Sequence, residues 1–404
     1  PYLYKVSDYG KKWQKITNGI DTKHFTRVVR ADPNRKGLLY AGTETGMYIS
    51  FDDGQNWTPF QLNLPIVPIT DLTIKNNNLI AATQGRSIWM IDDLTILHQL
   101  QDDFNNKNAV LFAPIPTYRM GGFQNKKAIK TAGLNLPSGV NVHFYLKNYN
   151  EKKDSVQVEF LEKNGDLIQA FSNFSKEKGK KITLTEKGNT VAWNMRYEGA
   201  KGFKGMVNWW ASLAGPRAVP GDYKVRLTIN GEAQEQPFTI LKNPNSTVTQ
   251  EDFQLQFDFL SDLLAKVTET HETIEDIRAL RSQLKAYNDR LKGDEAMDSI
   301  VNTSKSIIKT LTNIEERLYQ TKNRSRQDPL NFPIRLNNKL AHLNSLMSIG
   351  DYRPTNQAVA VKNELTGLID EQLNRYQSII KKDVPALNAL IKAAAVDAIS
   401  IDNE

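Results

Sequence analysis

The chain has 404 residues, enough for two or three domains, and its 40% of hydrophobic residues are enough to form their cores. It contains no cysteine, so disulfides, thiolate zinc sites and thiol catalysis are excluded. The net charge of +7 is spread along the chain and no run of about 18 apolar residues is present, so we expect neither a nucleic-acid partner nor a transmembrane helix.

A motif is repeated in the first hundred residues. One copy reads VSDYGKKW and the other SFDDGQNW, with Asp, Gly and Trp at the same spacing. The matched residues are Asp8, Gly10 and Trp13 in the first copy and Asp52, Gly54 and Trp57 in the second. The two tryptophans are 44 positions apart, and strand-like segments broken by glycine, proline and asparagine lie between them. A period of about 40–50 residues is typical of a four-stranded β-propeller blade.

Each residue of the motif has a structural role in a tight turn. Gly54 can supply a positive φ angle, and the side chains of Ser50 and Asp52 can accept backbone N–H groups. Trp57 can pack its ring over neighbouring strands. A calcium site needs more oxygen ligands than Asp8 and Asp52 provide. We therefore interpret the motif as a hairpin closure and predict no metal, no cofactor and no catalytic residue in it.

The repeated motif resembles the Asp-box (BNR) repeat of sialidases, sortilin-type (VPS10) propellers and xyloglucanase-like propellers. The strings LYAGTETGMYISFDDGQNW and AATQGRSIWMIDDL resemble more narrowly a bacterial family of WD40/YVTN/BNR-like repeat proteins, often labelled glycosyl hydrolase. The resemblance implies that residues 1–98 are the last two blades of a β-propeller. Because two blades cannot close a ring, the remaining blades would belong to the same longer chain or to an associated chain. The first copy departs from the motif, since Val6 replaces the serine.

The opening residues PYLYKVSDYG lack the basic and apolar segments of a signal peptide and read as the interior of a strand. We therefore expect a fragment of something longer or a processed product. The absence of cysteine, together with the resemblance, favours a periplasmic, outer-membrane-associated or secreted bacterial protein, although a cytosolic protein can also lack cysteine.

A different pattern follows the propeller-like segment. Residues 99–135 read as a linker that contains Pro114 and Pro116. Residues 136–243 contain about seven short alternating segments and Asn-Gly turns, which predict an immunoglobulin-like or fibronectin III-like β-sandwich. His143 lies in one of these segments without a second histidine or a suitably spaced carboxylate, so we do not expect it to bind a metal.

A few residues of the β segments are candidates for ligand contact. Trp209 and Trp210 are adjacent aromatics in a glycine-rich loop, where they could stack on a sugar ring or pack against the propeller-like segment. Arg86 falls at a strand junction where the resembled family also has arginine, and it could contact a ligand or form a structural ion pair. The other polar residues at suggestive positions are Arg27, Arg30 and Glu44.

Residues 244–404 are predicted to be helical. Thr249 and Asp252 have the spacing of a capping box, and apolar residues then recur every three or four positions until a break at Gly293. Further helices are expected at 300–318, 336–347, 356–381 and 384–398. Short loops between them predict an antiparallel helical bundle. The predicted fold class is therefore multidomain β plus α, with a partial Asp-box propeller, an Ig/FnIII-like sandwich and a C-terminal bundle.

The acidic residues of the first long helix do not form a di-iron motif, because no Glu-x-x-His pattern precedes His271 or His342. We interpret these residues as a solvated face, with Glu275 close to Arg278 and Arg281 on the same helix.

Two function classes stay open. The chain has no nucleophile elbow, zinc-protease motif or P-loop. A glycoside hydrolase needs two carboxylates at a defined separation, which propeller enzymes place at the centre of the closed ring. We favour a non-catalytic fragment of a secreted or envelope β-propeller protein that acts as a protein- or glycan-binding scaffold. The alternative is a sialidase- or xyloglucanase-like glycoside hydrolase whose catalytic residues lie mainly in blades absent from this chain.

Overall fold

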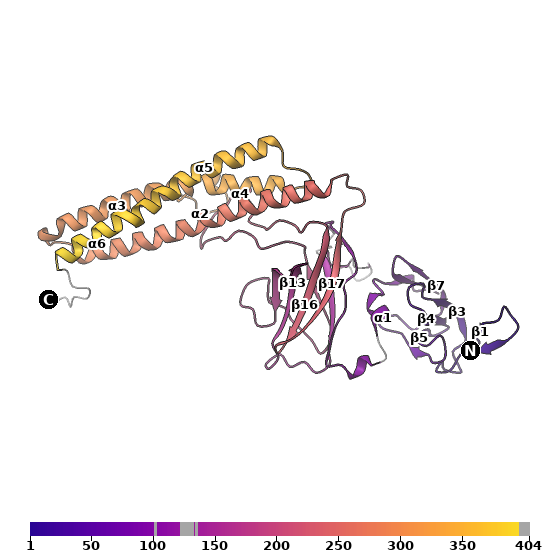
Figure 1. Cartoon of the computed structure of the whole chain (residues 1–404). Coiled ribbons are helices and arrows are strands. Elements are labelled where there is room, and N and C mark those ends of the chain that lie inside the picture. Colours follow the sequence, from indigo (N-terminus) through magenta and orange to yellow (C-terminus); the bar gives the residue numbers. More distant parts are fainter. Residues whose placement is uncertain (101–102, 122–132, 134–135, 396–404) are drawn as a thin grey trace.

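The computed structural model combines β-sheets with a C-terminal helical region, so the β plus α fold class is confirmed (Figure 1). The described residues are 1–100, 103–121, 133 and 136–395. We name three parts by their residues: the N-terminal β region (1–100), the central β region (103–248) and the helical region (249–395). Figure 1 shows the long helices extending from one end of the central β region, with the N-terminal β region beside it at the other side.

Three antiparallel sheets form the N-terminal β region. Their strands are β1 (Tyr4–Val6) with β2 (Trp13–Lys15); β3 (Thr26–Ala31), β4 (Leu39–Thr43), β5 (Gly46–Ser50) and β6 (Thr58–Pro59); and β7 (Ile69–Lys75), β8 (Asn78–Thr83) and β9 (Ile88–Ile91). Tyr40 of β4 packs with Ile69 in one core, while its neighbour Ala41 packs with Leu3 and Ile16 in another. Since successive strand residues face opposite sides, the sheet β3–β6 lies between the other two.

Gly42 of β4 allows the middle sheet to approach the sheet β7–β9 closely. A Cβ atom at this position would lie 2.7 Å from Ile69 Cγ2 and 2.8 Å from Val28 Cγ1. Ile69 is fully buried, so its side chain has little room to move away.

Two sheets surround one core in the central β region. The first sheet has the order β11 (Thr117–Tyr118), β17 (Glu232–Leu241), β16 (Gly221–Ile229), β13 (Val156–Glu162) and β14 (Leu167–Ser172), and the second has the order β10 (Ala109–Leu111), β12 (Val140–Leu146) and β15 (Lys187–Trp193). Alternate residues of β12 are buried, as the sequence pattern predicts. Phe160 and Trp193, one from each sheet, stack with their ring centroids 4.8 Å apart.

The structure differs from the linker predicted over residues 99–135. Within that segment, β10 pairs with β12 and β11 pairs with β17, so part of it belongs to the central sheets. Both strands lie at sheet edges, where nearby prolines such as Pro114 and Pro116 are tolerated because an edge strand needs fewer N–H donors. Two short helical turns, α1 (Thr95–Gln99) and η1 (Phe104–Asn106), also lie near its start. Residues 101–102, 122–132 and 134–135 of this segment lie outside the described residues.

The helical region begins with the predicted capping box. Thr249 Oγ1 accepts the Asp252 N–H (3.2 Å), and Asp252 Oδ2 accepts the Thr249 N–H (3.1 Å). The helices are α2 (Gln250–Arg290), α3 (Asp298–Leu318), α4 (Leu336–Met347), α5 (Asn356–Ser378) and α6 (Val384–Ala393), with short 3-10 turns at Glu295–Met297 and Asp328–Leu330. No helix among the described residues is both long enough and apolar enough to cross a membrane.

Two predictions in the helical region are wrong. A break between α5 and α6 is expected from the sequence, but the π-helical segment η4 (Ile379–Asp383) joins them without a turn. A wider helical turn accommodates the missing N–H of Pro385 at the start of α6. The predicted helix end at residue 398 lies outside the described residues. Arg278 and Arg281 pair with the buried Glu315 of α3 rather than with a residue of their own helix.

We expect Gly42→Ala to lower the free energy of unfolding by about 1–3 kcal/mol, because the added methyl group overlaps the side chains of Ile69 and Val28. Thermal and urea denaturation would measure the loss. Gly188→Ala in β15 is the matched control, because a Cβ atom there meets nothing within 4 Å. Equal stability of the Gly42→Ala variant and the unchanged protein would contradict the close approach of the two sheets.

Candidate functional site

Side-chain hydrogen bonds close the turn at residues 50–57. Ser50 Oγ accepts the Gly54 N–H (2.9 Å) and donates to Asp52 Oδ1 (2.8 Å). Asp52 also accepts the backbone N–H of Asn56 (2.8 Å) and its side-chain Nδ2–H (2.7 Å). Burial raises the pKa of Asp52, but the hydrogen bonds from Asn56 and Ser50 outweigh it and leave the pKa below its ordinary value. The carboxylate is therefore occupied within its own turn.

The first copy of the motif makes fewer bonds. Asp8 Oδ1 accepts the N–H groups of Lys11 (3.1 Å) and Lys12 (2.8 Å), and Gly10 has a φ of 96°. Val6 offers no hydroxyl group in place of Ser50, so the additional bonds of the second turn have no counterpart here.

The two matched tryptophans have different surroundings. Trp57 is 3% exposed, and its Nε1–H donates to the carbonyl oxygen of Ile16 (2.8 Å). Trp13 is 68% exposed, and its ring meets Tyr4 edgewise at a centroid distance of 6.3 Å. Trp57 lies directly before β6 of the middle sheet and is covered, whereas Trp13 begins β2 of an outer sheet.

The candidate arginines form separate contacts rather than one site. Arg27 forms an ion pair with Glu44, and Arg30 Nη2 lies 2.6 Å from Asp71 Oδ1. Arg86 is exposed in the turn between β8 and β9. Within the described part of the chain it forms no ion pair, so the structural ion pair considered for it is not present there. The described residues contain no group of three or more His, Asp or Glu side chains that could hold a metal ion.

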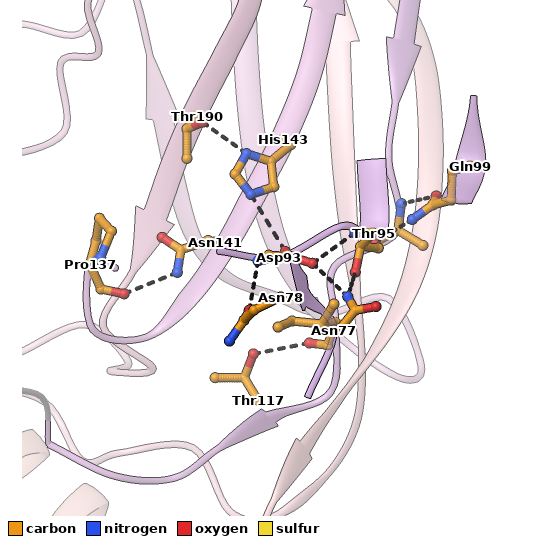
Figure 2. A network of polar contacts seen from close by, with 12 residues as sticks. Asn77, Asn78, Asp93, Thr95, Gln99, Thr117, Pro137, Asn141, His143 and Thr190 are labelled. Carbon is orange, nitrogen blue, oxygen red and sulfur yellow. Dashed lines mark hydrogen bonds and ion pairs between the residues drawn. The ribbon is translucent and has the colours of Figure 1, made fainter. Parts of the chain in front are cut away.

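A polar network joins the N-terminal and central β regions (Figure 2). Asp93, which follows β9, accepts hydrogen bonds from Asn77 Nδ2 (3.0 Å) and the Thr95 N–H (2.9 Å). His143 of β12 bonds Thr190 Oγ1 through Nδ1 (2.9 Å) and points its Nε2 at Asp93 Oδ2 (3.9 Å). Burial lowers the pKa of His143, although Asp93 opposes the shift. Sequence reasoning missed this carboxylate, because Asp93 lies on the other region of the chain.

A second buried carboxylate lies at the end of the same region. Asp32 is 7% exposed, and its Oδ2 meets His98 Nε2 (2.9 Å) and accepts from the Tyr40 hydroxyl (3.2 Å). Burial raises the pKa of Asp32, but the hydrogen bonds from His98 and from the backbone N–H of Asn34 outweigh this effect and leave the pKa below its ordinary value. A buried carboxylate with so many partners orders the local structure.

A groove of about 570 Å³ lies beside His98, between the N-terminal and central β regions. Three of its amide side chains already bond backbone groups: Gln99 bonds Ala113, while Gln234 and Gln236 bond Leu111. The three amide side chains of this groove are therefore already engaged within the protein.

The loop of residues 199–215 lies on the helical region, not on the N-terminal β region as one sequence interpretation has it. The Trp209 N–H donates to Asn338 Oδ1 (2.7 Å), and Asn338 Nδ2 donates to the Trp209 carbonyl oxygen (2.9 Å). Asn344 Nδ2 donates to two further carbonyl oxygens of the loop (2.8 and 3.1 Å). The backbone of the loop is thus held by side chains of α4.

His271 of α2 adds a buried contact to the same loop. Its Nδ1 lies 2.6 Å from the Lys201 carbonyl oxygen and its Nε2 lies 3.1 Å from Asn337 Nδ2. These partners suit a neutral ring that donates from Nδ1 and accepts at Nε2. Burial lowers the pKa of His271, although the bond to Lys201 and the charge of Glu275 oppose the shift. The ring is 1% exposed and also meets Phe203 edgewise.

The two adjacent tryptophans of this loop differ in how much of each side chain is exposed. Trp209 is half-buried, whereas Trp210 is 74% exposed and has a φ of 54°. Their ring centroids lie 6.5 Å apart, with an angle of 43° between the planes. Of the residues with predicted ligand contact, Trp210 presents the largest open aromatic surface, and it stands as the candidate binding residue.

Comparisons of this chain with protein-family models, with curated proteins and with solved structures find no match.

We expect the free energy of unfolding to fall as the pH decreases below about 6.5, because the unfolded state binds a proton at His271 more readily than the folded state does. His271→Asn retains a donor for the Lys201 carbonyl oxygen and cannot take up this proton, so part of the pH dependence should disappear. Urea denaturation between pH 8 and pH 5 would measure it. The curves should run parallel above pH 7, and parallel curves throughout would contradict the prediction.

Proposed function

We propose that the chain is a non-catalytic part of a secreted or envelope β-propeller protein that acts as a protein- or glycan-binding scaffold. The observation that carries the proposal is a stack of three sheets whose two outer faces each carry exposed apolar side chains. In a closed propeller every sheet is covered on both faces by its neighbours. Further sheets, from the same longer chain or an associated chain, would cover the two open faces.

The outer face of the β1–β2 hairpin supports this proposal. Lys5 forms an ion pair with Asp53, in the turn between β5 and β6 of the middle sheet, so the residues that alternate with Lys5 face outward. Tyr4 and Trp13 are 49% and 68% exposed on that outward face. Aromatic residues so exposed on a regular sheet are typical of a surface that another element covers.

The sheet β7–β9, at the opposite end of the stack, also carries exposed apolar side chains. Ile88 and Met90 of β9 are 70% and 55% exposed, while Trp89 and Ile91 between and after them face the core. The sheet β7–β9 has three strands and ends at β9, whereas the middle sheet has four. An uncovered apolar edge strand invites pairing with another strand.

The central β region is proposed to be an Ig/FnIII-like sandwich. Trp193 is fully buried between its two sheets, and the Tyr223 hydroxyl donates to the carbonyl oxygen of Val219 (2.7 Å). A tyrosine that bonds backbone a few residues upstream is a hallmark of such sandwiches.

A scaffold is favoured over a hydrolase because the candidate polar groups are already used. Asp52 closes its own turn, and Arg27 and Arg30 each have a carboxylate partner. A glycosidase site needs two carboxylates free to face a sugar. Such a pair would have to come from the proposed additional sheets.

The test is amide hydrogen exchange of β9, compared between this chain alone and the product of the complete gene. We expect strong protection of the β9 amides only in the complete product, where a further strand pairs with them. Ile88→Asp combined with Met90→Asp should remove the added protection and leave the Tm of this chain nearly unchanged, because both side chains are exposed.

Lys75→Asp, at an exposed position of the same sheet, is the matched control and should not change the protection. Equal exchange of β9 in both proteins would overturn the proposed completion of the sheets. Hydrolysis of polysaccharides by the complete product would favour the glycoside hydrolase over the scaffold.

A further inference from the structure

Two arginines lie directly opposite each other beside the core of the central β region. Arg196 and Arg217 are partners in an isolated antiparallel bridge. A hydrogen bond from the Ala218 N–H to the Met195 carbonyl oxygen (2.6 Å) holds the two segments together, and both of these residues belong to the core. Opposite residues of an antiparallel pair point their side chains to the same face, with Cβ atoms about 4.5–5.5 Å apart. The pairing therefore places two positive charges side by side.

A third arginine lies next to this pair. Arg119 is 5% exposed, and its Nε–H donates to the carbonyl oxygen of Ala218 (2.8 Å), the residue after Arg217. Its guanidinium group also lies over the ring of Phe253, 4.9 Å from the ring centroid. Burial lowers the pKa of Arg196, and the charges of Arg217 and Arg119 lower it further. The three guanidinium groups are therefore close enough to repel one another.

Among the described residues, one carboxylate forms an ion pair with this cluster. Asp351 pairs with Arg119. Arg196 Nη1 donates to the uncharged carbonyl oxygen of Gly215 (2.7 Å), and the Arg217 side chain has no hydrogen bond or ion pair with the part of the chain that the structure describes. A guanidinium group carries five N–H donors, so most donors of Arg196 and Arg217 are unused.

Two neighbouring segments leave the positive charge uncompensated. Glu162 is engaged by the hydroxyl group of Tyr197, the residue after Arg196. A Cβ atom on Gly121 would lie 3.9 Å from Arg217 Nη2, and the sequence that follows Gly121, residues 122–135, contains no aspartate or glutamate. A charge that is taken partly out of water is costly unless it is paired, and like charges opposite each other destabilise a strand pair. A bound anion would remove both costs.

We propose that Arg196 and Arg217 bind a tetrahedral oxoanion, a phosphate or sulfate group, between their guanidinium groups. A guanidinium group binds two oxygens of such an anion through parallel N–H···O bonds. A tetrahedral anion has enough oxygens to meet two guanidinium groups at once, whereas a carboxylate has two oxygens and is satisfied by one. The buried charge of Arg119 adds to the attraction. This inference goes beyond the proposed function and does not depend on completion of the sheets.

The experiment titrates the chain with sodium phosphate and with sodium sulfate at low millimolar concentrations, while sodium chloride keeps the ionic strength constant. Calorimetry measures Kd, and thermal unfolding measures Tm. We expect both anions to bind and to raise the Tm, because a ligand held by the folded state alone stabilises it. Sodium acetate, the carboxylate probe, should bind more weakly.

Arg217→Gln separates anion binding from stability. It should weaken the binding of phosphate and sulfate about tenfold or more, because charge-assisted hydrogen bonds are lost. In chloride alone the same variant should keep or raise the Tm, because it removes repulsion and no hydrogen bond among the described residues. Arg326→Gln, which removes the same charge from an exposed position of the helical region, is the matched control and should leave Kd unchanged.

Phenyl phosphate, a monoester, identifies the source of the anionic group. Tighter binding than that of inorganic phosphate would assign the site to phosphate esters, and weaker binding would assign it to the free anion, and both results support an oxoanion site. Four results would overturn the proposal: no binding of phosphate or sulfate, equally tight binding of acetate, binding that Arg217→Gln does not weaken, or an equal loss of binding in Arg326→Gln. A large fall in the Tm of Arg217→Gln in chloride would also overturn it, since the charge of Arg217 would then already have a partner within the protein.

Discussion

Hydrogen bonds between two asparagine side chains of α4 and the backbone of loop 199–215 hold the helices against the central sheets. Asn338 and Asn344 are almost fully buried, so each bond forms where water cannot replace it. Phe203 of the loop enters the core of the helical region, and His271 secures the Lys201 carbonyl oxygen beside it. The path of the loop and the exposure of Trp210 depend on this joint.

Local patterns in the sequence predicted most of the regular elements. The alternation in β12, the capping box at Thr249 and the ends of α4 agree with the structure, because each depends on neighbours within a few residues. The π-helical connection at η4 was not predicted, since a proline after an interrupted pattern usually marks a new helix. The strands β10 and β11 were missed as well, because short edge strands carry little periodicity.

The candidate site was predictable only in part. Ser50 and Asp52 of the turn could be assigned a structural role, since the partners of their side chains are at most four residues away. The pair Trp209 and Asn338 are 129 positions apart, and an asparagine in an amphipathic helix looks like any solvated residue. Contacts between distant segments, such as Asp93 with His143, leave no local trace in a single sequence. The exposure of Trp210 is therefore a property of the tertiary structure alone.

The length of α2 has a mechanical consequence. The helix runs through 41 residues without interruption, which corresponds to about 60 Å. Its far end lies well away from the sheets (Figure 1). Any load applied there acts through a long lever arm, so the asparagine joint must resist torque. Hydrogen bonds at two positions along α4, Asn338 and Asn344, oppose such a rotation better than one contact of equal strength. A partner bound at the far end of α2 would therefore turn together with the β regions.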